Sequence, residues 1–136
     1  MAKDIAQMFG SESVQTFLGL PAVKNLQMLE AKAAILGVPA ATPYASVGNY
    51  CTGAPDAIRA AIAPYAANIG HVDFDIGEPV FPGGTVCAVD CGDLDYSETD
   101  FAANRALIKQ SVMTVVRKGA VPIVLGGDDS VPIPMF

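Results

Sequence analysis

The chain has 136 residues and a mass of 14.0 kDa, which is a usual size for one domain. It carries 14 acidic and 8 scattered basic residues, for a formal net charge of −6, and this balance argues against nucleic acid or an anionic membrane surface as a partner. Because 51% of the residues are hydrophobic and only 16% are charged, we expect a folded chain that buries a large apolar face against further polypeptide or another subunit.

Cysteine usage and the absence of long apolar runs bear on location. The long uncharged stretch 33–55 is interrupted by Gly, Pro, Asn and Thr, so it has the pattern of neither a signal peptide nor a membrane span. The three cysteines, at 51, 87 and 91, form no C-x-x-C pair and are odd in number, which favours reduced thiols over a disulfide framework. These features predict a soluble, cytoplasmic protein.

The first elements are an arm and a buried strand. We predict an N-terminal arm over 1–32, in which the apolar segment 16–23 is extended because Gly and Pro interrupt it. The short apolar run 33–38, stopped by Gly37 and Pro39, is typical of a strand buried on both faces.

A helix and a second strand follow. The helix begins at Pro55, which suits a first helical turn, and it is kinked or ends near Pro64. The stretch 69–82 is predicted to be a loop or a short hairpin. Alternation of apolar and polar residues over 85–90, stopped by Gly92, predicts the second strand.

The clearest helix of the sequence spans 101–118, with basic residues in its last turn. Ser97 and Asp100 form a capping-box pattern ahead of it. A third apolar strand is predicted over 122–125, and 130–136 has the pattern of a helix start.

Alternating strands and helices at this spacing predict an α/β fold with right-handed crossovers on a parallel sheet. We expect 33–136 to belong to a single such domain. Three strands and two helices leave part of a parallel sheet without cover, because such a sheet needs helices on both faces.

Carboxylates gather after the second and third strands, where ligands bind in open α/β sheets. Asp90, Asp93 and Asp95 follow or end the second strand, and Asp128 and Asp129 follow the third. Adjacent carboxylates repel one another unless a cation or hydrogen-bond donors compensate, so such pairs often mark Mn²⁺ or Mg²⁺. The alternative is that Asp128 or Asp129 simply caps the helix that begins after it.

Several motifs now carry a resemblance to one family. L-G-G-D-D-S-V-P at 125–132 resembles the G-G-D-H-S motif of the ureohydrolases, the arginase and agmatinase family. A-I-L-G-V-P at 34–39, G-A-P-D-A-I-R at 53–59 and V-D-C-G-D-L at 89–94 are similar to further motifs of that family, and T-F-L-G-L-P at 16–21 is similar to its agmatinase-like N-terminal arm. The order and spacing match over nearly the whole chain.

The resemblance implies a three-layer, arginase-type α/β fold with a mainly parallel sheet, of which this chain holds the N-terminal portion. It implies two Mn²⁺ ions whose bridging hydroxide attacks the carbon of a small cationic guanidino substrate and releases urea. Asp129 stands where the family has a histidine metal ligand, and Asp128 is expected to orient that ligand. A homo-oligomer, a trimer or a hexamer, is also implied.

Two departures from the family pattern leave alternatives open. The family's D-A-H-x-D and D-x-D-x-x-D-P ligand motifs do not occur here, so catalytic residues are expected beyond Phe136 and the chain alone is expected to be inactive. Ala40 and Ala41 replace a common Phe-Asp pair, which leaves the substrate open. The first hypothesis is an agmatinase-like, manganese-dependent hydrolase of a linear guanidino compound. The alternative is a non-catalytic fragment or assembly subunit without a complete metal site.

Overall fold

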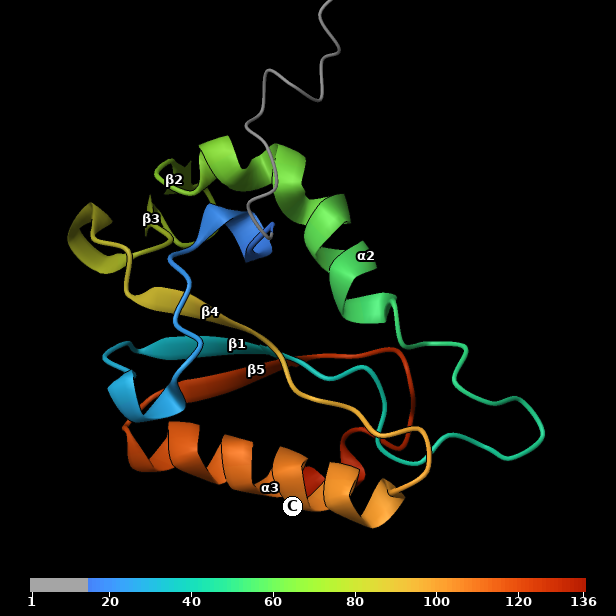
Figure 1. Ribbon diagram of the computed structural model, residues 1–136. Helices are drawn as coiled ribbons and strands as arrows, with labels where there is room; N and C mark the ends of the chain where they lie inside the picture. The colour runs from blue at the N-terminus through green and yellow to red at the C-terminus, as the bar shows by residue number, and fades with distance from the viewer. Residues whose placement is uncertain (1–14) are drawn as a thin grey trace, which may run out of the picture.

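Three parallel strands form the central sheet in the computed structural model, which describes residues 15–136 (Figure 1). They are β1 (Ala33–Gly37), β4 (Ala88–Asp93) and β5 (Val121–Leu125). Their order in the sheet is β4-β1-β5, and both outer strands run parallel to β1. The predicted α/β class with a parallel sheet is therefore confirmed.

Two helices cover the two faces of this sheet. Helix α2 (Ala54–Ile62) connects β1 to β4 on one face, and α3 (Phe101–Arg117) connects β4 to β5 on the other (Figure 1). Successive connections thus alternate between faces, as in doubly wound α/β folds, and they give three layers.

The core consists of two clusters, one on each face of β1. Leu36 is 1% exposed and packs in the α3-side cluster with Ile108. Ile35 is 2% exposed and packs in the α2-side cluster with Leu125, against the partly buried Ile58. Adjacent residues of one strand point to opposite faces, so β1 is buried on both sides, as its continuous apolar run predicts.

The helix boundaries differ slightly from those expected. Helix α2 ends at Ile62, and the chain continues as the 3-10 helix η3 (Ala63–Asn68), which contains Pro64, so the α-helix ends near Pro64 as predicted. Asp100 is the N-cap of α3, because its side chain accepts a hydrogen bond from the Ala103 N–H at 2.9 Å. Ser97 instead accepts from the Asp100 N–H at 3.0 Å. The predicted capping box therefore starts too early, since Asp100 itself caps the helix.

The arm is described from residue 15 onward, and its first fourteen residues lie outside the described part. It contains two short 3-10 turns, η1 (Phe17–Gly19) and η2 (Leu26–Met28). Between them Ala22 forms a parallel bridge with Asp90 of β4. The segment predicted to be extended is thus a short turn followed by a strand-like stretch at the edge of the sheet.

The remaining elements are short. Strands β2 (Val72–Asp73) and β3 (Glu78–Pro79) form an antiparallel hairpin, which confirms the hairpin alternative for this stretch. The 3-10 helices η4 (Pro82–Gly84) and η5 (Ile133–Met135) complete the list, and η5 occupies the predicted C-terminal helix start. No helix in the described part of the chain is both long and apolar enough to cross a bilayer.

The second strand of the sequence lies three residues later than predicted. Alternation placed it at 85–90, but pairing with β1 begins only at Ala88, opposite Ala33, and continues to Asp93. The alternating pattern indicates only that side chains of an extended segment are alternately buried and exposed. The strand itself begins where the backbone forms hydrogen bonds with β1.

A bulge in β4 places two carboxylates on the same face of the sheet. Ile35 pairs with Asp90 and Gly37 pairs with Asp93, so β4 uses one residue more than β1 over this interval. Gly92 lies in the bulge with φ of 76°, a left-handed conformation that favours glycine. Residues three apart in a regular strand point to opposite faces, and the extra residue brings Asp90 and Asp93 onto one face.

Gly92→Ala is expected to destabilise the protein by about 1–2 kcal/mol, because a Cβ is disfavoured in the left-handed region although space is open around it. Urea unfolding measures the change. Gly70→Ala is the control, since Gly70 also has open space and no left-handed φ, and it should stay within about 0.5 kcal/mol of the wild type. Equal losses in both variants would contradict the role of the bulge.

Candidate functional site

A buried arginine joins the two carboxylates of β4. Arg59, on α2, is 3% exposed. Its Nε and Nη2 donate to Oδ2 and Oδ1 of Asp90 at 2.8 and 3.0 Å, and its Nη1 donates to Oδ1 of Asp93 at 2.5 Å. Asp90 is 2% exposed, so this is a bidentate ion pair in the interior, with Asp93 at its more exposed end.

Further donors complete the hydrogen bonding of Asp90. The backbone N–H groups of Phe17 and Gly92 donate to its two oxygens at 2.7 and 2.8 Å. Burial alone would raise the pKa of Asp90, but the hydrogen bonds from Arg59, Phe17 and Gly92 outweigh it and hold this pKa below its usual value. Burial by itself would lower the pKa of Arg59, and its two carboxylate partners raise it instead.

The ion pair also explains a glycine at the end of β1. A Cβ on Gly37 would overlap Oδ1 of Asp93 and would lie 3.1 Å from Nη1 of Arg59. The Asp93 carboxylate thus lies directly over the backbone of Gly37. Side chains of any size at this position would displace it.

These contacts show what compensates the β4 carboxylates within the fold. Asp90 and Asp93 accept hydrogen bonds from Arg59, and Asp90 also accepts them from backbone N–H groups. The motif at 53–59 therefore contacts the motif at 89–94, because the first supplies Arg59 and the second supplies Asp90 and Asp93. Sequence reasoning noted Arg59 only as part of a motif, although an arginine on the inner side of a helix facing an acidic strand is a signal for such a pair.

The turn after β5 holds the other two carboxylates. Asp128 is 7% exposed, and its Oδ1 accepts from the Ser130 N–H at 2.8 Å. It therefore orders its own turn, and the predicted helix cap is wrong, because the N-cap of η5 is Pro132 and no side chain caps that helix. Asp129 is exposed and accepts a hydrogen bond from the Tyr44 hydroxyl at 3.2 Å. That hydrogen bond and the Asp129 charge raise the pKa of Tyr44. The metal-ligand role of Asp129 and the orienting role of Asp128 stay predictions.

The two glycines before this turn are required by space. Neither lies in the left-handed region. A Cβ on Gly127 would lie 2.7 Å from Cβ of Ala54, and one on Gly126 would lie 3.1 Å from the carbonyl oxygen of Val38. The turn therefore packs against the start of α2 and the end of β1, and this close approach is the reason for glycine at both positions.

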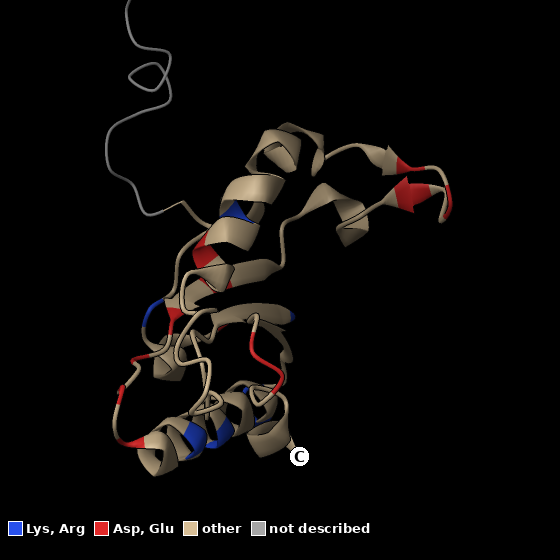
Figure 2. Ribbon diagram, turned by 90° about the vertical axis from the view of Figure 1, so that its right-hand side faces the viewer, with Lys and Arg blue, Asp and Glu red and all other residues tan. Residues whose placement is uncertain are grey.

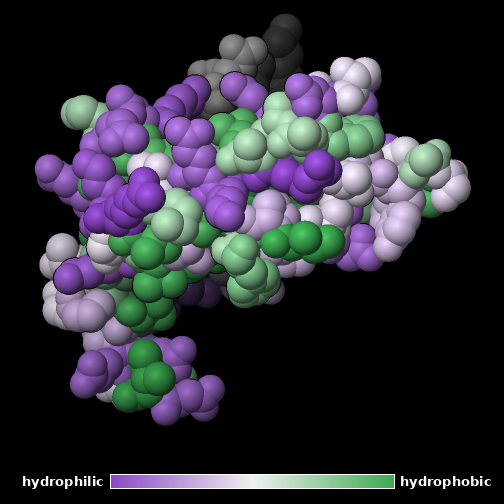
Figure 3. Space-filling view, turned by 90° about the horizontal axis from the view of Figure 1, so that it is seen from below, coloured by the Kyte–Doolittle hydropathy of each residue, from purple (hydrophilic) through white to green (hydrophobic). Residues whose placement is uncertain are grey.

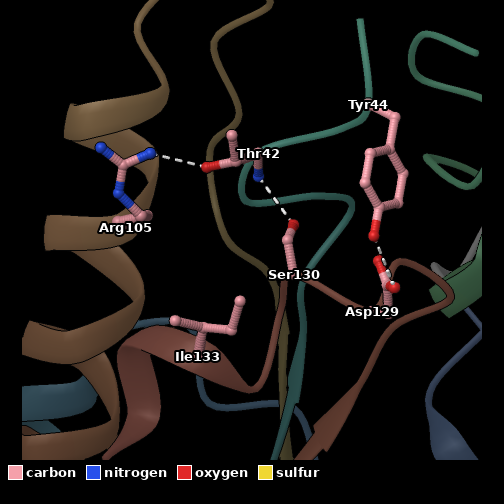
Figure 4. Close-up of a pocket in the computed structure, with 6 residues that line it drawn as sticks. All are labelled: Thr42, Tyr44, Arg105, Asp129, Ser130 and Ile133. Atoms are coloured by element: carbon pink, nitrogen blue, oxygen red, sulfur yellow. Dashed lines mark hydrogen bonds between the residues drawn. The ribbon is translucent and has the colours of Figure 1, made fainter. Parts of the chain in front are cut away.

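A cleft of about 300 Å³ opens beside Asp129 (Figure 4). Its other lining residues come from the loop after β1, from α3 and from the turn after β5: Thr42, Tyr44, Arg105, Ser130 and Ile133. Two hydrogen bonds tie these segments together, from Arg105 Nη1 to Thr42 Oγ1 at 2.6 Å and from the Thr42 N–H to Ser130 Oγ at 2.8 Å. Sequence reasoning missed Thr42, Tyr44 and Arg105, although two of them follow a strand end.

The described residues do not form a complete metal centre. Within 15–136 no three His, Cys, Asp or Glu side chains come together as a group that could hold an ion. Asp129 offers a carboxylate to the cleft, and it is the only acidic residue among the six that line it. The chemistry of this donor suits Mn²⁺, but one carboxylate is too few to hold it.

Two of the three cysteines lie near these carboxylates, because Cys51 packs against Gly127 and Cys91 follows Asp90 in β4. All three are free, and Cys91 is buried in β4. Burial, with the neighbouring Asp90 charge, raises the pKa of the Cys91 thiol to about 11, so this thiol stays protonated and unreactive at neutral pH.

Comparison with known proteins gives a consistent result. A model described as "Arginase family" matches residues 31–136. Similar solved structures include a hypothetical agmatinase from Burkholderia thailandensis (TM-score 0.68, 22% identity, covering 92% of this chain and 37% of that one). Proclavaminate amidino hydrolase from Streptomyces clavuligerus is also similar (TM-score 0.67, 22% identity, covering 90% of this chain and 38% of that one). So is formimidoylglutamase from Bacillus subtilis (TM-score 0.63, 23% identity, covering 91% of this chain and 37% of that one). No curated protein sequence matches.

These structures share the fold of this chain, which spans less than two-fifths of their length. The predicted arginase-type architecture is therefore confirmed for the part of the fold that the chain covers. The cleft and the ion pair lie within that part.

Replacing Arg59 with Met is expected to cost about 3–5 kcal/mol of stability, because it leaves Asp90 buried without its charged partner. Asp56→Asn is the matched control. Asp56 lies 3.6 Å from the same guanidinium, but its side chain is 80% exposed, so the loss should stay within about 0.5 kcal/mol. Urea unfolding of both variants tests this, and a small loss in Arg59→Met would contradict the importance of the ion pair.

Acid is expected to destabilise the wild type through Asp90. Because its folded pKa lies below the usual value of about 3.8, the stabilisation is fully present above that value. It is lost as the pH falls from about 4 through the folded pKa. In Arg59→Met this acid-induced loss should be smaller, since the folded pKa of Asp90 moves up. Urea unfolding midpoints of the wild type and of Arg59→Met, measured from pH 7 to pH 2, test this difference. Equal losses of stability with falling pH in the two proteins would contradict it.

Proposed function

This chain belongs to the arginase family, and from that premise we propose that it is part of a metal-dependent hydrolase of a linear amidino compound. The proposed reaction is agmatinase-like: cleavage of a guanidino group to urea and an amine. The observation that carries the proposal is the exposed carboxylate of Asp129. It lies in the turn after β5, where the family motif falls, and it borders a cleft at the carboxyl ends of the strands.

The carboxylate in the cleft supports a cationic substrate. Asp129 contributes this carboxylate to the wall, and the buried Asp128 lies next to it in the chain. The one basic residue of the lining, Arg105, donates a hydrogen bond to Thr42. The Tyr44 hydroxyl donates a hydrogen bond to Asp129 and holds this side chain at the cleft. A guanidinium group is planar and positively charged, so it pairs well with a planar, negatively charged carboxylate. The cleft therefore offers a place for the guanidino end of the substrate.

Manganese is the metal we propose. Mn²⁺ lowers the pKa of bound water and supplies a nucleophile at neutral pH. Asp129 can provide one oxygen ligand, and the remaining ligands have to come from outside residues 15–136. On this proposal residues 33–136 form the N-terminal part of one α/β domain, with 1–32 as its arm, in a cytoplasmic oligomer.

The test is urea release by the protein purified from its native source, after its intact mass has been measured. With Mn²⁺, agmatine, arginine and guanidino acids are supplied one at a time, and urea above background is expected for at least one of them. Chelation should remove this activity. Background rates for every compound would overturn the proposal.

Asp129 is expected to matter for metal binding as well as for activity. Asp129→Ala should weaken Mn²⁺ binding at least about tenfold, whereas Asp129→His should preserve or strengthen it, because imidazole is also a good ligand. Glu30→Gln is the control, since Glu30 is exposed and precedes β1 at the opposite end of the sheet. Calorimetric titration with Mn²⁺ gives the dissociation constants of the wild type and of the three variants.

A second candidate is a non-catalytic arginase-family subunit. The observation that favours it is that residues 15–136 assemble no group of three metal-ligating side chains. It predicts that the native protein has a mass of 14.0 kDa, binds no stoichiometric Mn²⁺ and is unaffected by Asp129→His. Turnover with bound Mn²⁺ would overturn this candidate.

A further inference from the structure

The hairpin of β2 and β3 projects from the molecule with an apolar tip. Phe74 is 98% exposed and Ile76 is 61% exposed, and Val72 and Val80 beside them are more than half exposed. In Figure 2 the hairpin extends away from the rest of the protein, and seen from below it forms a separate lobe at the lower left of Figure 3. These four side chains are called the hairpin surface below.

An ordered turn holds Phe74 in this exposed position. Oδ1 of Asp73 accepts hydrogen bonds from the N–H groups of Asp75 and Ile76 at 2.9 and 3.3 Å. The Gly77 N–H donates to the Asp73 carbonyl at 2.7 Å. An aromatic side chain gains much from burial, yet the described part of the chain leaves Phe74 98% exposed. Such a side chain is suited to burial against another surface.

The hairpin surface is surrounded by negative charge. Asp73, Asp75 and Glu78 belong to the hairpin, and no Lys or Arg occurs in the sequence between Arg59 and Arg105. The surface that receives it should therefore combine exposed apolar side chains with positive charge.

Helix α3 carries such a combination on its outer side. Lys109, Met113 and Arg117 follow one another at intervals of four residues, so they form one stripe, with Val116 beside it. Met113 is 40% and Val116 is 50% exposed. The helix contains no acidic residue, and Lys118 follows it directly. The set of Lys109, Met113, Val116 and Arg117 is called the α3 stripe.

Within one molecule the two surfaces cannot meet. The hairpin lies beside α2 at the top of Figure 1, and α3 lies at the bottom on the other side of the sheet; Figure 2 shows the same separation. Their opposite charges and their exposed apolar side chains are complementary, so contact requires two copies of the chain.

We propose that the hairpin surface of one copy docks on the α3 stripe of a second copy. Phe74 and Ile76 pack against Met113 and Val116, while Asp75 and Glu78 face Lys109 and Arg117. Because two different surfaces meet, each copy can bind one neighbour through its hairpin surface and another through its α3 stripe. Such head-to-tail contacts form a closed ring when successive rotations between copies add up to a full turn. This proposal does not depend on the proposed activity.

The first test is the oligomeric state of the purified protein by analytical ultracentrifugation. The wild type is expected to assemble, and Phe74→Ser is expected to raise the dissociation constant at least about tenfold. Val47→Ser is the control, because Val47 is 57% exposed in the loop between β1 and α2, away from both surfaces. A monomeric wild type, or equal effects of both variants, would overturn the proposal.

The second test exchanges charges between the two surfaces. Asp75→Lys and Lys109→Glu alone should each weaken assembly about tenfold, since like charges then face one another. The double variant should recover most of the affinity, because the exchanged side chains at these two positions again carry opposite charges. A misfolded variant or a different partner would give no such recovery, so failure of the double variant to recover would overturn α3 as the receiving surface.

Discussion

The ion pair between Arg59 and Asp90 is the interaction on which the arrangement of this protein depends. It connects α2 to β4, and through the Phe17 N–H it also connects the arm to the same carboxylate. A buried charge without its partner is costly, so these three segments can pack together only in the one arrangement that pairs Arg59 with Asp90. Asp93 extends the pair to the edge of the sheet and covers the backbone at Gly37. Apolar packing alone would allow α2 to slide along the sheet, whereas a bidentate pair fixes its position.

The bulge in β4 makes this pairing possible. Without the extra residue at Gly92, Asp93 would point to the α3 side and away from the guanidinium. A backbone irregularity of one residue thus decides which face of the sheet carries the charge. The same pairing positions the start of α2, against which the turn after β5 packs at Gly127. The location of Asp129 therefore depends, through α2, on an ion pair in another part of the sheet.

Carboxylates in the described part of the chain have different partners. Asp90 and Asp93 are paired within the fold, and Asp128 orders its own turn. Asp129 is held at a cleft by a phenol and keeps oxygen lone pairs for a ligand. The acidic residues of the hairpin lie on the surface, far from the basic side of α3. The carboxylate proposed to bind a ligand at the cleft is thus separate from the carboxylates proposed to contact a second copy at the hairpin.

Patterns along the chain were enough to predict the fold class, the parallel strands, the long helix and the position of the family motifs. These depend on local periodicity, glycine and proline, which are visible along the chain. The same patterns placed β4 three residues early and took Ser97 for the cap of α3, because hydrogen bonds to β1 and the backbone angles at Asp100 set those boundaries. Only the tertiary structure decided that Arg59 neutralises Asp90 and Asp93, that Gly37 and Gly127 are required by space, and that Tyr44 and Arg105 line the cleft beside Asp129. The physical reason is that charge pairing and steric exclusion act between residues tens of positions apart, and their strength depends on burial, which a one-dimensional pattern does not contain.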